Sequence, residues 1–130
     1  MKVLFYNKLL MNIRVLLLST LVCSFAAASF AADPMEQART LADTGNFQKA
    51  SEVAAALGNS ESLAFAAASL AVFAYEIAGE SDRQKLFLMA IQYAETAVEL
   101  DSTSSEAYLQ LAHTLGRYAQ TLGTLTALSE

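Results

Sequence analysis

The 130-residue sequence contains one cysteine, one proline, one histidine and no tryptophan. The cysteine, Cys23, lies in an apolar N-terminal stretch. The rest of the chain therefore carries no disulfide, no thiolate nucleophile and no cysteine-bound metal. Clusters of β-branched residues and alternating apolar and polar residues are also scarce, which argues against strands and favours an all-α chain.

Residues 1–31 resemble a secretory signal. Three basic residues precede an apolar stretch at 15–28, and small residues occupy the −3 and −1 positions of a cleavage site before Ala32. Met11 opens a shorter signal and is a second candidate start. An uncleaved anchor is the alternative, but the stretch is shorter than the roughly 20 residues that a spanning helix needs.

Cleavage changes the charge balance. All 13 acidic residues and five of the eight basic residues follow the cut, which gives residues 32–130 a net charge of −8. Nucleic acids and anionic membrane surfaces are bound through basic patches, so neither is an expected partner. We expect a periplasmic or secreted protein without a membrane span after cleavage.

Helical periodicity and break signals predict five helices. Asp33, Pro34 and Glu36 form a strong helix start. Glycines at Gly45 and Gly58 mark the next two breaks. The expected helices lie at about 34–44, 47–57, 61–78, 81–100 and 104–122.

Two further helix starts are predicted from capping-box spacing, in which a hydroxyl residue precedes Glu or Gln by three positions. Ser81 and Gln84 have this spacing before the fourth helix, and Thr103 and Glu106 have it before the fifth. Breaks of two to five residues between the helices predict antiparallel hairpins.

Alanine spacing around the last break resembles the tetratricopeptide repeat, a helix-turn-helix unit of about 34 residues. Ala90 and Ala97 are seven apart, and an apolar stripe follows on the next helix: Tyr108, Leu111, Ala112 and Leu115. An earlier copy has small and bulky residues at Ala38, Leu41 and Ala50 around the turn "GNF". Two positions depart from the repeat, since Ser102 replaces a proline and Ala94 replaces an aromatic residue.

The resemblance implies antiparallel hairpins stacked as a right-handed solenoid. Its hairpins would span about 34–57 and 61–100, and about 104–122 would be the first helix of a third unit. Solenoid repeats usually need about three units, so we expect the chain to be truncated at its C-terminus. The alternative is a short adaptor whose exposed end is closed by a partner or a second copy.

Together with the signal, the segments "AETAVELD" and "TLGRYAQ" resemble periplasmic T-component proteins associated with tripartite (TRAP) transporters. That resemblance implies a ligand carrier with a central pocket, transporter subunits as partners and assembly into a homo-oligomeric ring.

No catalytic, cofactor-binding or metal-binding constellation is found in the sequence, so an enzyme is not expected. His113 has no cysteine partner and lies off the apolar stripe of its helix. The aromatic residues of the middle helices are expected in the core: Phe65, Phe73, Tyr75, Phe87 and Tyr93.

Repeats of this family bind ligands on a concave face lined by the first helix of each hairpin. The residues that the resemblance places there are Tyr75, Gln110, His113 and Arg117. We therefore expect a scaffold or adaptor that binds a protein, a peptide or a small ligand in a helical groove. The transporter-associated carrier is the alternative.

Export should remove the N-terminal segment. When the full chain is expressed in a Gram-negative bacterium, we expect the purified protein to begin at Ala32, because the small residues at −3 and −1 fit signal peptidase. Intact mass and N-terminal sequencing check this. A protein that keeps its apolar segment and stays with the membrane fraction would support the uncleaved anchor instead.

Overall fold

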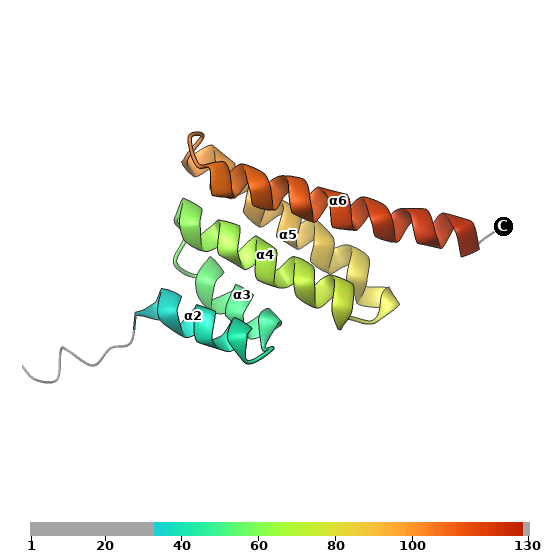
Figure 1. Cartoon of the computed structure of the whole chain (residues 1–130), viewed down its shortest axis with the longest axis horizontal. Coiled ribbons are helices and arrows are strands. Elements are labelled where there is room, and N and C mark those ends of the chain that lie inside the picture. The colour runs from blue at the N-terminus through green and yellow to red at the C-terminus, as the bar shows by residue number, and fades with distance from the viewer. Residues whose placement is uncertain (1–32, 129–130) are drawn as a thin grey trace, which may run out of the picture. The chain divides into compact units, whose positions relative to one another are not determined.

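The computed structural model describes residues 33–128. The predicted signal and the candidate start at Met11 lie outside the described residues. In this part the prediction of an all-α chain is confirmed (Figure 1). The helices are α2 (Pro34–Asp43), α3 (Phe47–Ala55), α4 (Ser60–Glu76), α5 (Glu80–Leu100) and α6 (Ser105–Leu128).

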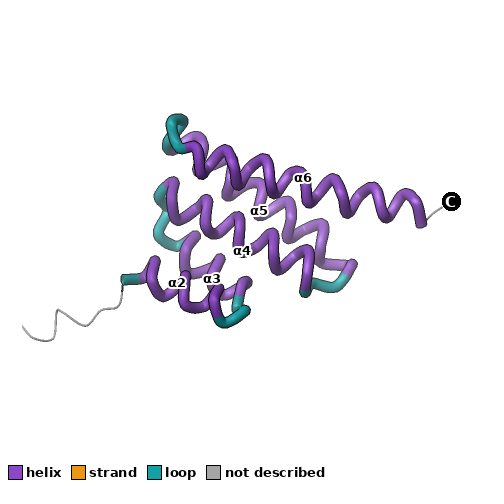
Figure 2. The backbone as a smooth tube through the Cα atoms, viewed as in Figure 1, coloured by secondary structure: helices purple, strands orange, loops and turns teal. Residues whose placement is uncertain are grey.

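Each helix packs against the next one along the chain, and α4 also packs against α6. Helix α4 therefore lies at the centre, in contact with α3, α5 and α6. Short loops connect the helices (Figure 2), and α5 lies behind α4 and α6 in the view of Figure 1. Stacking of these helices into a regular repeat solenoid remains a prediction.

The first helix boundaries follow the predicted signals. The Asp33 carboxylate accepts a hydrogen bond from the Met35 backbone N–H at 3.0 Å, with Pro34 at the first helical position. Gly45 and Gly58 have φ of 83° and 68°, which is the left-handed conformation that commonly follows a helix end. The prediction that these glycines end α2 and α3 is confirmed, although α3 ends two residues before the expected position.

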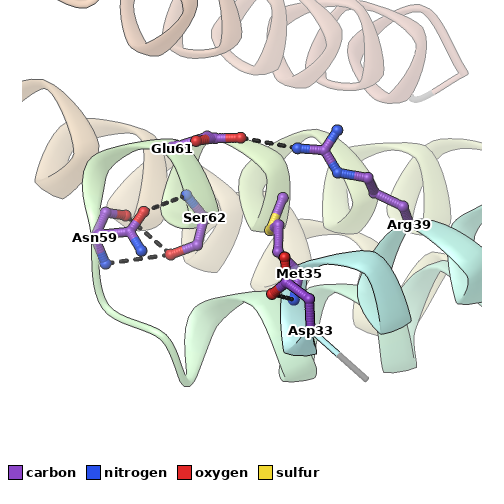
Figure 3. Close-up of polar contacts among 6 residues, drawn as sticks. All are labelled: Asp33, Met35, Arg39, Asn59, Glu61 and Ser62. Carbon is purple, nitrogen blue, oxygen red and sulfur yellow. Dashed lines mark hydrogen bonds and ion pairs between the residues drawn. The ribbon is translucent and has the colours of Figure 1, made fainter. Parts of the chain in front are cut away.

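Helix α4 begins with a capping box that the sequence analysis did not predict, since it treated this segment only as the break after the second helix. The Asn59 side chain accepts from the Ser62 backbone N–H at 2.9 Å, and the Ser62 hydroxyl contacts the Asn59 backbone N–H at 3.2 Å (Figure 3). Together these bonds satisfy two backbone donors of the first turn.

The capping box predicted at Ser81 is wrong. Helix α5 starts one residue earlier, with Gly79 as its N-cap and without a side-chain cap bond. The Gln84 amide instead donates to the Tyr118 hydroxyl on α6 at 3.3 Å. The Gln84 side chain therefore forms a tertiary hydrogen bond instead of the helix cap that the sequence pattern predicted.

The capping box predicted at Thr103 is also wrong. It is the Ser104 hydroxyl that accepts from the Ala107 backbone N–H at 3.2 Å. The Thr103 hydroxyl and backbone N–H both donate to the Asp101 carboxylate, at 2.7 and 2.9 Å. These bonds hold the pKa of Asp101 below its ordinary value of 3.8, so an ionised carboxylate organises the turn at neutral pH.

The buried core consists largely of alanine. Among the described residues, every buried apolar side chain except Leu63, Leu70 and Phe87 belongs to alanine. Side chains this small allow helix backbones to approach closely. Serine hydroxyls can then form hydrogen bonds to backbone carbonyls of the neighbouring helix. Ser51 on α3 donates to the Ala66 carbonyl on α4, and Ser60 on α4 donates to the Ala97 carbonyl on α5, both at 2.8 Å.

Two aromatic residues connect the core. Tyr93 is half-buried and packs against three separate groups of buried residues, which are contributed by α2 to α6. Phe87 is fully buried on α5, and its ring lies 5.8 Å from that of Tyr118 on α6. The expectation of a buried side chain is confirmed for Phe87, whereas the other predicted core aromatics are half-buried.

Arg83 holds the junction between α4 and α5. Its Nε donates to the Ala74 carbonyl at 3.1 Å, and its Nη2 donates to the Ala78 carbonyl at 3.2 Å. The last carbonyls of a helix lack partners within the helix and carry partial negative charge. The guanidinium therefore satisfies the end of α4 and fixes the direction in which α5 leaves.

Phe87 should be the most sensitive core position. We expect Phe87→Ala to lower the free energy of unfolding by about 3–5 kcal/mol, because it leaves a cavity where α4, α5 and Tyr118 pack together, and the surrounding helices can relax into it only in part. Urea unfolding followed by circular dichroism measures this change. Leu88→Ala on the same helix is the matched control, since Leu88 is 51% exposed and should lose much less stability; equal losses would contradict the assignment.

Candidate binding surfaces

Helix α6 presents three faces along its described side chains. The buried face contacts the core through Ala107, Thr114 and Thr121. A second face carries polar groups at a spacing of four, three and four residues: Glu106, Gln110, His113 and Arg117. The third face is apolar and exposed. Three of the four predicted site residues thus share the polar face.

The polar face of α6 borders a cleft of about 270 Å³ that three helices line. Helix α4 contributes Phe65 and Ala68 to its apolar wall, and α2 contributes Met35. The polar lining comes from Arg39, Glu61, Glu106 and Gln110. We call this the α2–α4–α6 groove. Of the four predicted residues, only Gln110 lines the cleft directly.

The polar lining of this groove forms two side-chain pairs, an ion pair and a hydrogen bond to a carboxylate. Arg39 on α2 and Glu61 on α4 form an ion pair at 2.8 Å across the opening (Figure 3). The Gln110 amide donates to the Glu106 carboxylate at 2.7 Å. Both pairs are exposed to solvent, so each contributes little to stability and is easily exchanged for contacts with a ligand.

The structure brings Tyr75 and Arg117 together. The guanidinium carbon of Arg117 lies 4.3 Å from the centre of the Tyr75 ring, a cation–π arrangement. Tyr75 follows Phe65 and Ala68 on one face of α4 by helical spacing, and Arg117 follows Gln110 on α6. The pair therefore continues the walls of the groove beyond the cleft.

His113 stays apart from these contacts. Its side chain is exposed, and it shares the polar face of α6 by spacing alone.

Neither ion pair found in the described part of the chain includes Arg117. The contact that the structure shows for its guanidinium is the one with the Tyr75 ring.

A second region of clefts was missed by the sequence analysis. Two clefts of about 470 and 460 Å³ share Gln48, Phe73 and Ile77, between α3, the end of α4 and the start of α5. Ile77 directly follows α4 and is 54% exposed, although most of the apolar side chains of α4 are buried or half-buried. The sequence analysis placed Ile77 inside the expected helix at 61–78, and the resemblance directed attention to the other face of the chain.

Two searches over residues 33–128 gave negative results. No group of three or more histidine, cysteine, aspartate or glutamate side chains in this range is arranged to hold a metal ion. No helix described there is both long and apolar enough to cross a membrane.

Comparison with known proteins gave no match: no family model, curated protein or solved structure is significantly similar to this chain.

The Tyr75–Arg117 contact should be measurable as a coupling energy. In a double-mutant cycle with Tyr75→Leu and Arg117→Met, we expect a coupling of about 0.5–1 kcal/mol in the free energy of unfolding, the lower range for cation–π pairs, because both side chains are only half-buried. Urea unfolding of the four proteins gives this value. Additivity within about 0.3 kcal/mol would mean that the two side chains do not interact in solution.

Proposed function

We propose that this chain is an exported scaffold or adaptor of the tetratricopeptide type, which binds a peptide segment of a partner protein in the α2–α4–α6 groove. The observation that carries the proposal is the lining of one cleft by α2, α4 and α6, which are alternate helices of the chain. Repeats of the resembled family bind ligands on a face lined by alternate helices in this way.

The residues of the groove suit an extended peptide. Met35, Phe65 and Ala68 offer an apolar wall for one or two side chains. The Gln110 amide can pair with a peptide backbone once it leaves Glu106. Further along, Arg117 carries a positive charge without an acidic partner among the described ion pairs. We expect the preferred peptide to combine an apolar side chain with a carboxylate that reaches Arg117.

The transporter-associated ligand carrier remains the alternative. The clefts around Phe73 and Ile77 support it, because their larger volumes and partly apolar lining suit a small ligand better than a peptide. These clefts and the groove share helix α4 but no lining residue, so variants can separate the two proposals.

A peptide library displayed on phage provides the test. We expect the purified full chain to select peptides that share an apolar and an acidic position. By fluorescence anisotropy, Ala68→Arg should weaken their binding by about tenfold or more, since it fills the floor of the groove. Arg117→Glu should weaken peptides with a carboxylate more than their amide versions.

Ile77→Arg is the matched control, because it adds the same side chain in the second region of clefts. It should leave peptide affinity unchanged, and circular dichroism verifies that each variant is folded. A library that yields no binding peptide would overturn the proposal. Peptides that respond to Ile77→Arg but not to Ala68→Arg would also overturn it and would favour the clefts around Ile77.

A further inference from the structure

The polar face of α6 carries opposite charges at its two ends. Glu106 lies in the first turn of α6 and lines the cleft, and Arg117 follows on the same helix. Because α6 is continuous between them, the eleven positions from one to the other make about three helical turns, and both side chains leave the helix on the same face. The two charges are therefore about 17 Å apart along the helix.

Both charges lack an oppositely charged partner among residues 33–128. Neither ion pair found in this range includes Glu106 or Arg117. The Arg39–Glu61 pair at the cleft is balanced within itself, so it leaves the charge of Glu106 unpaired. The groove thus has an unpaired carboxylate near the starts of α4 and α6 and an unpaired guanidinium further along, at Tyr75.

Each of these two charged side chains is held in place by a neutral neighbour. The Gln110 amide donates to the Glu106 carboxylate at 2.7 Å. The guanidinium carbon of Arg117 lies 4.3 Å from the centre of the Tyr75 ring, and Arg117 is half-buried. Neither contact removes the charge. A charged group that is ordered before binding loses less conformational entropy when a ligand pairs with it.

We infer that the groove selects peptides that carry a basic side chain at Glu106 and an acidic side chain at Arg117, about five residues apart. An extended peptide advances about 3.3 Å per residue, so it covers the distance between the two charges in that length. Phe65 and Ala68 precede Tyr75 on α4, which places the apolar wall between the two charges. This selectivity rests on the proposed function and adds to it a second charge and its spacing from the first.

The two ends of the groove also disfavour ligands of a single sign. A peptide with acidic side chains alone would bring a carboxylate near Glu106, and one with basic side chains alone would bring a cation near Arg117. The net charge of −8 after the predicted cleavage repels acidic ligands from a distance as well. A peptide that carries both charges avoids this repulsion and places each charge opposite a group that is already ordered.

A random peptide library displayed on phage and selected on the purified full chain tests the spacing. We expect the enriched peptides to share a basic residue about four to six positions from the acidic one, with an apolar residue between them. Enriched peptides that keep the apolar and acidic positions but have no basic residue at this distance overturn the inference and leave the proposed function standing. A library that yields no binding peptide overturns both.

Substitutions on both sides of the contact identify the partner of the basic residue. The probes are the most enriched peptide, synthesised with a fluorescent label, and the same peptide with its basic residue replaced by methionine. Glu106→Gln should weaken binding of the first peptide by about threefold, which is usual for an exposed ion pair. It should leave the affinity of the methionine peptide unchanged. Fluorescence anisotropy measures both affinities.

Glu95→Gln is the matched control, because it removes one negative charge from an exposed position on α5 that does not line the groove. It should not distinguish the two peptides, and circular dichroism verifies that both variants are folded. Equal effects of Glu106→Gln on the two peptides would mean that Glu106 does not contact the basic residue, and would overturn the inference. An equally selective effect of Glu95→Gln would reveal a general charge effect and would overturn it as well.

Discussion

Close packing of helices over alanine is the constraint on which the rest of this structure depends. Where alanines such as Ala66 and Ala97 face a neighbouring helix, the gap is short enough for a serine hydroxyl on one helix to reach a carbonyl on the next. Larger side chains at these positions would separate the backbones and break both bonds. The few large core residues, with Phe87 at their centre, then fix how the helices are stacked.

The same constraint limits what the molecule can do. A core of alanine buries little apolar area per residue, so much of the large apolar surface stays outside. Some of it lines clefts, as Phe65 and Phe73 do, and some forms the exposed face of α6. A small helical chain with this distribution is suited to hold other molecules on its surface, and both proposals follow from where that surface lies.

Among the sequence predictions, breaks were more reliable than caps. Glycine before a polar residue marks a helix end through backbone geometry alone, and Gly45 and Gly58 behave as expected. The capping boxes predicted at Ser81 and Thr103 do not form, because a side chain of each makes another hydrogen bond. Gln84 donates to the Tyr118 hydroxyl, and Thr103 donates to the Asp101 carboxylate. Helix α6 extends to Leu128, whereas the sequence analysis expected this helix to end at about residue 122.

The candidate site was predictable in part. Helical spacing already placed Gln110, His113 and Arg117 on one face, since that depends only on 3.6 residues per turn. The contact between Arg117 and Tyr75, and the inclusion of Met35 and Phe65 in one cleft, needed the packing of α2, α4 and α6.

The sequence by itself determined helical content, the main breaks and the small residues at which helices meet, because these follow from local backbone preferences and periodicity. Only the tertiary structure decided which apolar residues are covered. Tyr108 and Leu115 belong to a stripe that looks like core, yet both are half exposed. Burial depends on which helices arrive from elsewhere in the chain, and spacing within one helix carries no information about that.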